Sequence, residues 1–148
     1  MEPKHILAGG GKAVNVLGTP MLLRLSGSDT NGTLAVVESH DAPGGGPPPH
    51  IHHREDETFQ VLEGEYEFMI AGNTVTAKVG DTLFAPRGIP HTYRCVSQTA
   101  GKLSVVLTPP GFENFFAEIG AMSPEEQQNI PRVMEIAKGY GLEFLPPG

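Results

Sequence analysis

The 148-residue sequence lacks the features that mark several large classes of protein. It contains a single cysteine, Cys95, which excludes an internal disulfide and a cysteine-rich zinc site. The formal net charge is −7 and Lys and Arg form no cluster, so neither nucleic acid nor an anionic membrane surface is an expected partner. No charged and apolar leader opens the sequence, and no apolar run approaches the length of a membrane span, which favours a cytoplasmic protein.

Glycine and proline, by contrast, are abundant, with 19 and 14 residues. This composition favours many short strands joined by tight turns over long helices. From about residue 12 to residue 108, apolar and polar residues alternate in short segments such as ETFQVLEG (57–64) and EYEFMIAGN (65–73). Strands of this length and spacing predict an all-β sandwich or barrel with a packed inner face and a solvated outer face, within one domain over residues 1–148.

After residue 110 the pattern changes, and we expect a short helical tail over about residues 111–140. GFENFFAEIGAM (111–122) predicts a helix with its aromatic residues on one face. Ser123 and Glu126 predict a capping box at the start of the next helix, and Gly139 is the expected residue just beyond the end of the last. This tail is too short to have its own core, so we expect it to pack on the outside of the β body or on a second subunit.

The segment GGPPPHIHHREDE (45–57) gathers histidine and acidic side chains directly behind three prolines. Side chains two apart on a strand share a face, so His50 and His52 point the same way and His53 points the other way. Glu57 joins the face of the first two histidines only if a turn or bulge intervenes. A buried carboxylate is costly unless it is paired or binds a cation. Two imidazoles and one carboxylate that converge in this way indicate a divalent metal of the first transition row.

A second histidine segment, GDTLFAPRGIPHTY (80–93), supports this prediction. His91 follows a Pro-x-Gly turn and begins an alternating run with Tyr93 and Cys95. If the two segments form neighbouring strands of one sheet, His91 can close the metal site. Their spacing in the sequence leaves open whether they are neighbours.

Both segments resemble the signature motifs of the cupin superfamily. Position by position, the first motif is similar to the run Gly44-x5-His50-x-His52-x4-Glu57-x6-Gly64. The second motif is similar to the run Gly80-x5-Pro86-x-Gly88-x2-His91. Cys95 stands where the second motif usually has Asn, a departure that touches no metal ligand. The motifs cover residues 44–95, and the fifteen residues between them resemble the short spacing of microbial single-domain cupins.

The resemblance implies a double-stranded β-helix, or jelly roll, whose barrel spans about residues 12–108 and carries the helical tail. It also implies that one divalent transition metal (Fe, Mn, Ni, Co, Cu or Zn) is bound inside the barrel by His50, His52, Glu57 and His91. Four protein ligands on a six-coordinate ion would leave two positions open, for a bidentate oxygen substrate or for a substrate with dioxygen. Neutral imidazoles and one carboxylate suit such an ion.

Within the superfamily, HIHHREDETFQVLEGEYEF (50–68) and PGFENFF (110–116) resemble the quercetin-dioxygenase-like group. That resemblance implies a metal-dependent dioxygenase of a small enolic or aromatic hydroxyl compound, with Glu57 as ligand and as the catalytic general base. Two alternatives need the same four ligands. One is a non-redox isomerase, lyase or decarboxylase that uses the metal as a Lewis acid, and the other is a non-catalytic module that binds a small ligand. The sequence does not separate them.

The remaining polar residues near the motifs have simpler interpretations. Glu55 and Asp56 are expected in a solvated acidic turn, and His53 is expected to be exposed or to be a hydrogen-bond partner of a ligand. Cys95 is expected as a small buried hydrophobic residue. Tyr93 fits two alternatives, either a core position or a cavity position from which its hydroxyl donates a hydrogen bond.

The resemblance also implies a partner. Related cupins commonly dimerise through an N-terminal strand or by sheet packing, and VNVLGTPMLLRL (14–25) is the candidate segment here. An exposed edge strand needs such cover. We therefore expect a homodimer that acts on or binds a small molecule.

Overall fold

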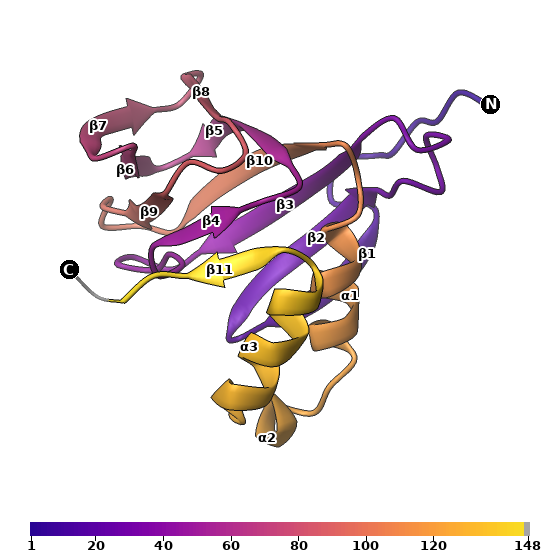
Figure 1. The fold of residues 1–148 in the computed structure, drawn as a ribbon. Helices are drawn as coiled ribbons and strands as arrows, with labels where there is room; N and C mark the ends of the chain where they lie inside the picture. The colour runs from indigo at the N-terminus through magenta and orange to yellow at the C-terminus, as the bar shows by residue number, and fades with distance from the viewer. Residues whose placement is uncertain (147–148) are drawn as a thin grey trace.

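The computed structural model describes residues 1–146. Its strands form two antiparallel sheets that face each other in the jelly-roll arrangement expected from the sequence (Figure 1). One sheet has six strands in the spatial order β1 (Lys12–Val16), β2 (Thr19–Leu25), β3 (Ala35–Asp41), β10 (Gly101–Thr108), β5 (Asp56–Glu63) and β8 (Thr82–Ala85). The other has five, in the order β11 (Leu142–Phe144), β4 (His50–His52), β9 (His91–Cys95), β6 (Glu65–Ile70) and β7 (Asn73–Lys78).

The core lies between the two sheets and follows from period-two alternation. Every second residue of β3 from Ala35 and of β10 from Gly101 is buried. Phe59 from one sheet meets Phe68 from the other with ring centroids 5.2 Å apart, in an edge-to-face contact. The inner faces predicted for the segments 57–64 and 65–73 are therefore confirmed at these rings.

The glycine-rich loop before β4 holds that short strand beside β9. The amide of Gly44 donates to the carbonyl of Cys95 (2.8 Å), and the amide of Cys95 donates to the carbonyl of Gly45 (2.9 Å). A side chain at Gly46 would collide with the carbonyl of Tyr93, so only glycine permits this close approach. The loop thus positions the start of β4 beside β9, where His50 pairs with His91.

The tail forms the helices α1 (Glu113–Gly120), α2 (Pro124–Gln127) and α3 (Ile130–Gly139). The predicted capping box is confirmed, because the hydroxyl of Ser123 accepts from the amide of Glu126 and the Glu126 carboxylate accepts from the amide of Ser123. The prediction for Gly139 was wrong, since it is the last residue of α3. The chain turns instead at Gly141, whose φ of 79° is accessible to glycine at little cost.

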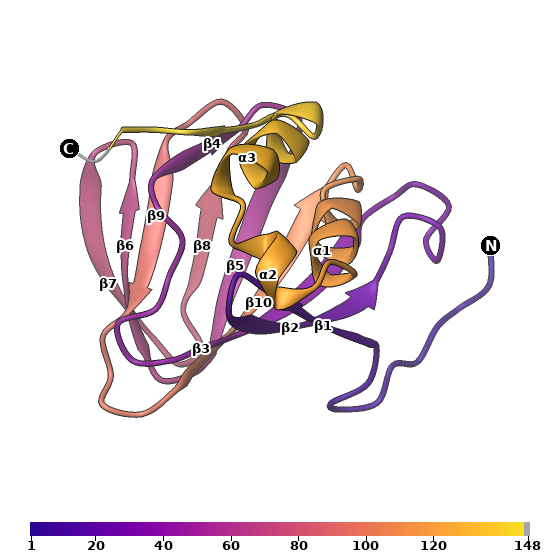
Figure 2. The ribbon, with the colours of Figure 1, turned by 90° about the horizontal axis from the view of Figure 1, so that it is seen from below.

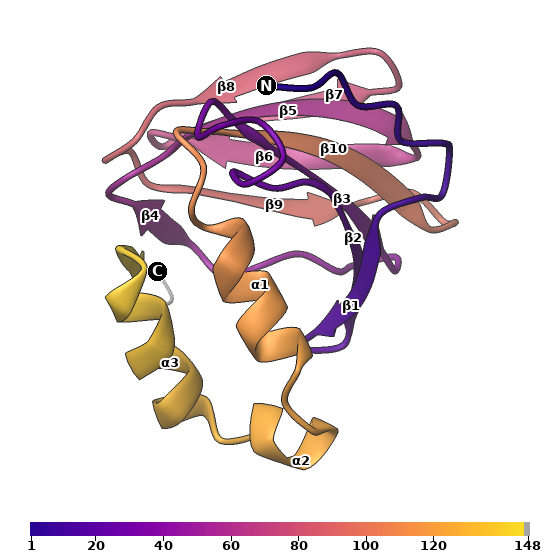
Figure 3. The same ribbon diagram turned by 90° about the vertical axis from the view of Figure 1, so that its right-hand side faces the viewer.

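The helices cover one end of the barrel. Figures 2 and 3 show α1 and α3 next to each other, with α1 beside β1. Helix α3 contacts β11, the strand that follows it in Figure 1. The expectation that the tail packs on the β body is therefore confirmed. The three-residue strand β11, which the sequence did not predict, pairs with the outer edge of β4.

The start of α1 is tied to the six-stranded sheet by a buried carboxylate. Glu113 accepts hydrogen bonds from the amide of Gly27 (2.8 Å), in the loop after β2, and from the amide of Gly111 (2.6 Å). Phe112 and Phe115 are buried on either side of it.

No helix within residues 1–146 has the length and apolar character needed to cross a bilayer.

Candidate metal centre

Four side chains that are distant in the sequence converge inside the barrel near the end that the tail covers. His50 and His52 come from β4, Glu57 from β5 and His91 from β9. All four are buried, with at most 6% of each residue exposed, and each offers a ligand atom within 4.8 Å of those of the others. The structure thus brings together the whole set that the motifs indicated.

The strand geometry explains this convergence. Antiparallel pairing places His50 directly opposite His91, and alternation puts His52 on the same inward face. The chain then bends at residues 53–55 and crosses to the other sheet, where Glu57 begins the buried face of β5. The intervening turn that Glu57 required is therefore present.

The distances within the cluster are those of a site in which one atom could contact all members. Oε1 of Glu57 lies 2.8 Å from Nε2 of His52 and 3.1 Å from Nε2 of His91. The ring centroid of His50 is 5.0 Å from that of His52 and 4.4 Å from that of His91.

Each imidazole is oriented by a bond on its other nitrogen. Nδ1 of His50 lies 2.8 Å from the carbonyl of Pro48, and Nδ1 of His91 lies 3.3 Å from the carbonyl of Ile89. A carbonyl can only accept, so these Nδ1 atoms carry a proton. Nε2 is the atom of each ring that is left to bind an ion, and in His91 it faces the Glu57 carboxylate. Outer hydrogen bonds of this kind fix the tautomer and the ring orientation of metal-binding histidines. The donor set therefore fits a transition-metal ion.

Glu55 provides the same support for His52. Its carboxylate accepts from Nδ1 of His52 at 3.4 Å, and the residue is 3% exposed. The expectation of a solvated position was wrong for Glu55, because the bend at 53–55 folds this side chain inward. Asp56 is nearer to the expectation, since it forms a surface ion pair with Arg87 at 3.2 Å. His53 points outward, as predicted, and pairs with Glu143 of β11 at 2.9 Å.

The side chains of the cluster shift one another's pKa values even without a cation. Burial, together with the neighbouring His91 and His52, lowers the pKa of His50 to about 4. Burial opposes the charged form of His52, but the Glu57 and Glu55 carboxylates together outweigh it and raise the pKa of that imidazole to about 9. Burial would also raise the pKa of Glu57, yet the facing histidines hold it well below its usual range. The carboxylate thus stays ionised beside a positive partner, a place that a cation can take.

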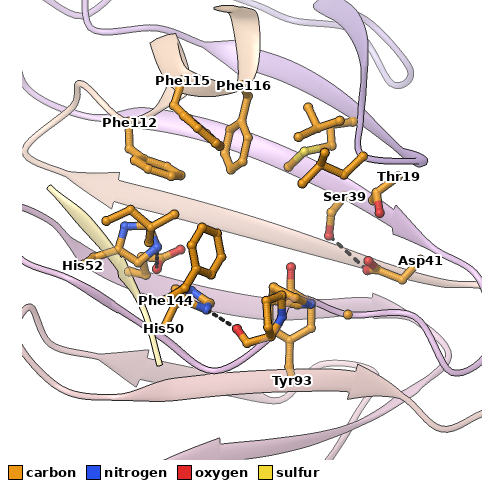
Figure 4. Close-up of a pocket in the computed structure, with 18 residues that line it drawn as sticks. Thr19, Ser39, Asp41, His50, His52, Tyr93, Phe112, Phe115, Phe116 and Phe144 are labelled. Carbon is orange, nitrogen blue, oxygen red and sulfur yellow. Dashed lines mark hydrogen bonds and ion pairs between the residues drawn. The ribbon is translucent and has the colours of Figure 1, made fainter. Parts of the chain in front are cut away.

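A cavity of about 290 Å³ opens from the cluster (Figure 4). This is close to the lower limit of typical small-molecule pockets. Its walls include residues that the sequence interpretation did not connect with the site: Thr19, Ser39, Asp41, Phe112, Phe115, Phe116, Leu142 and Phe144. Ser39 and Asp41 follow Val37 at two-residue intervals, so alternation places them on the same inward face. This was the one sequence signal that could have identified any of these residues. Tyr93 also lines the cavity, and its ring packs against the core as well, so it combines features of both alternatives.

The helical tail forms the wall nearest the histidines. The ring of Phe112 meets His52 edge-on at 4.5 Å, and Phe144 of β11 lies 6.5 Å from His50, both measured between ring centroids. The tail is therefore part of the site and not merely a cover on the outside of the barrel.

Comparison with known proteins agrees with this geometry. A family model described as the cupin domain matches residues 37–107, a span that contains all four clustered side chains. A quercetin 2,3-dioxygenase from Bacillus subtilis is 35% identical over 128 residues, which is 80% of this chain and 37% of that protein. The chain spans between 29% and 61% of the length of the curated relatives that it matches.

Solved structures share the fold. A predicted oxalate decarboxylase from Thermotoga maritima superposes with a TM-score of 0.59 at 24% identity, covering 65% of this chain and 89% of that one. The polyketide cyclase RemF from Streptomyces resistomycificus gives a TM-score of 0.61 at 24% identity, covering 72% and 79%. At this identity the likeness extends to the fold alone, because one barrel can host many chemistries.

Proposed function

Since this chain belongs to the cupin superfamily, we propose that it holds one divalent transition-metal ion on four side chains: His50, His52, Glu57 and His91. We further propose that it is a metal-dependent dioxygenase of a small enolic or aromatic hydroxyl compound. The observation that carries the metal site is the convergence of three imidazoles and one carboxylate, with the outer nitrogen of each ring hydrogen-bonded. The similarity to quercetin 2,3-dioxygenase supports the reaction class.

The donor set limits the ion. Imidazole nitrogen and carboxylate oxygen suit Fe, Mn, Co, Ni, Cu or Zn, and disfavour ions that need only oxygen ligands. One carboxylate offsets part of the charge of a divalent ion, so the site favours an anionic oxygen group on the ligand. When bound, the ion would supply Lewis acidity toward a substrate oxygen.

The protein's own groups have separate roles in this proposal. Glu57 lines the cavity, so its carboxylate can accept the proton of a substrate hydroxyl and serve as the catalytic base. Phe112, Phe115 and Phe116 form an apolar wall of the same cavity, with the ring of Phe112 edge-on to His52. That wall can pack against an aromatic ring and keep bulk water away from the cluster.

Metal analysis and an oxygen electrode test the proposal together. We expect purified protein to carry about one transition-metal ion per chain, and His50→Ala and His91→Ala to lose it. His53→Ala, which removes an exposed imidazole from the same segment, is the matched control and should keep the metal. Full metal retention by both ligand variants would show that these residues do not hold the ion.

The reaction class is tested with quercetin and with simple β-diketones. We expect dioxygen uptake that depends on the compound and on the metal. Turnover that continues unchanged under anaerobic conditions would contradict a dioxygenase and would favour isomerase, lyase or decarboxylase chemistry at the same ligands. Binding without consumption of any compound would favour a non-catalytic module.

We also propose that the protein is a homodimer. β1 is an edge strand of the six-stranded sheet, and edge strands are usually covered. The segment 14–25, which comprises β2 and most of β1, is available for strand exchange or sheet packing. Light scattering of the purified protein tests this directly, and a monomer at micromolar concentration would contradict it.

A further inference from the structure

We propose that Asp41, with Ser39, Thr19 and Tyr93, forms a second polar subsite in the same cavity, which binds a hydroxyl group of the ligand. This inference rests on the proposed function in one respect only, namely that the other end of the ligand lies at the metal-binding cluster. It adds a substrate class: a molecule with a metal-binding oxygen at one end, an apolar or aromatic body, and a hydroxyl group at the other end.

Asp41 is a buried carboxylate with one oxygen committed and one free. It lies at the end of β3 and is 3% exposed. Its Oδ2 accepts from the hydroxyl of Tyr66 at 2.6 Å and from the hydroxyl of Ser39 at 3.0 Å. Over residues 1–146, no group donates a hydrogen bond to Oδ1 and no Lys or Arg pairs with the carboxylate. No buried side-chain oxygen of the described residues lacks a partner, and Asp41 lines the cavity, so Oδ1 is open to the cavity and free to accept from a ligand.

The groups that hold the Asp41 carboxylate are closely packed. Gly101 of β10 pairs with Asp41 across the sheet, and a Cβ at this glycine would lie 2.5 Å from the hydroxyl of Tyr66. The absence of a side chain therefore lets the Tyr66 ring reach the carboxylate from within the core. Because Oδ2 already accepts from Tyr66 and Ser39, Oδ1 is the oxygen that can accept from a ligand.

The subsite is distinct from the metal cluster. On β10, Asp41 pairs with Gly101 whereas Glu57 pairs with Leu107, so the two carboxylates lie at different levels of one sheet. Figure 4 shows Thr19, Ser39 and Asp41 on one side of the cavity and His52 on the other, with Tyr93 between.

The surrounding groups select a hydroxyl. The free oxygen of Asp41 can only accept when ionised, whereas the hydroxyl groups of Thr19 and Tyr93 can also donate. A ligand hydroxyl satisfies both, because it donates to Asp41 and accepts from a neighbouring hydroxyl. An ether oxygen cannot donate, so it would leave Oδ1 unpaired. The cavity between the two ends is lined by apolar side chains such as Met21, Phe115 and Phe116.

Asp41→Asn is a sharp test, because it alters one atom of this arrangement. The amide oxygen can still accept from Tyr66 and Ser39, and the NH2 group then replaces the free acceptor with a donor. We would titrate phenol, anisole and benzylammonium into the zinc-loaded protein of 148 residues and follow the backbone amide signals of Ser39 and Asp41 by NMR. Phenol and anisole differ in whether the oxygen carries a proton.

For the wild-type protein we expect phenol to shift these signals and to bind about tenfold more tightly than anisole. In Asp41→Asn the ratio should fall to about one or invert. Glu135→Gln, an equal change of charge on the exposed face of α3, should keep the wild-type ratio. Thr19→Val, which leaves Asp41 intact, should weaken phenol binding about threefold through loss of the neighbouring hydroxyl.

Three results would overturn the inference. These are an unchanged phenol-to-anisole ratio in Asp41→Asn, no phenol-dependent shift at Ser39 and Asp41, or tighter binding of benzylammonium than of phenol, which would indicate a cation subsite. None of these measurements requires turnover. If dioxygen uptake fails while the phenol preference holds, the dioxygenase proposal falls and the subsite stands; the reverse outcome removes only the subsite.

Discussion

The Glu55 carboxylate lies 3.4 Å from Nδ1 of His52, while Nε2 of the same ring lies 2.8 Å from Glu57. The imidazole is thus held between two carboxylates, one behind it and one in the cluster. Glu55 keeps the proton on Nδ1 and so leaves Nε2 to serve as a ligand.

Loss of Glu55 should therefore weaken metal binding without removing a ligand. We expect Glu55→Ala to raise the dissociation constant for zinc by roughly 10- to 100-fold, as is typical for groups that support a metal-binding histidine. Competition with a chromophoric chelator measures this. Asp56→Asn changes the adjacent acid, which pairs with Arg87 at the surface, and should bind zinc as the wild type does. Equal affinities for Glu55→Ala and wild type would mean that the contact is incidental.

Metal binding should stabilise the fold, because the unfolded chain does not assemble the cluster. At a free zinc concentration of one hundred times the dissociation constant, the free energy of unfolding should rise by about 2.7 kcal/mol. Urea denaturation with and without zinc measures the difference. His53→Ala should show the same gain and His91→Ala almost none. A similar gain in His91→Ala would place the bound ion elsewhere.

Gly101 should tolerate no side chain. A Cβ there would lie 2.5–2.7 Å from the ring and hydroxyl of Tyr66, so Gly101→Ala must displace a fully buried aromatic ring. We expect a loss of roughly 1–3 kcal/mol in the free energy of unfolding. Gly139→Ala is the matched control, because open space surrounds that position at the end of α3, and it should be neutral or slightly stabilising. Equal stability of the two variants would contradict the close packing described for Tyr66.

The attachment of the tail depends on Glu113, whose two oxygens each accept from a backbone amide. In Glu113→Gln one of these positions becomes an NH2 group that faces an N–H donor, so one buried bond is lost. We expect a cost of about 1–3 kcal/mol in the free energy of unfolding, measured by urea denaturation. Glu118→Gln, on the exposed side of the same helix, keeps an amide oxygen that can accept from the Tyr140 hydroxyl, so it should cost less than about 0.5 kcal/mol.

The strands were predictable from the sequence for a local reason, because alternation fixes which side chains share a face. That His91 joins His50 and His52 followed from the resemblance to the cupin motifs, since the spacing of the two segments left open whether they are neighbours. Glu55 was not predictable, because its burial depends on how the bend at 53–55 folds against the barrel. β11 was not predictable, because its three residues are too few to show an alternating pattern and its position depends on pairing with β4. The burial and hydrogen bonding of Asp41 were not predictable either, because they depend on Tyr66, a partner 25 residues away in the sequence.

The carboxylate of Asp41 also predicts a dependence of stability on pH. Burial raises its pKa in the folded protein, and the hydrogen bonds from Tyr66 and Ser39 offset only part of this effect. The folded state therefore binds this proton more tightly than the unfolded state does. Above the folded pKa the ionised group costs stability, and this cost disappears as the pH falls toward the unfolded value of about 3.9.

Asp41→Asn removes that titration while it keeps both internal bonds. The difference in free energy of unfolding, wild type minus Asp41→Asn, should thus increase as the pH is lowered from 7.5 to about 4.5, because the other carboxylates titrate equally in both proteins and cancel. Urea denaturation of the two proteins at each pH provides the difference. If the difference stays constant or decreases over this range, Asp41 is not a carboxyl whose pKa is raised by burial, and its free oxygen is better solvated than its place in the cavity wall indicates.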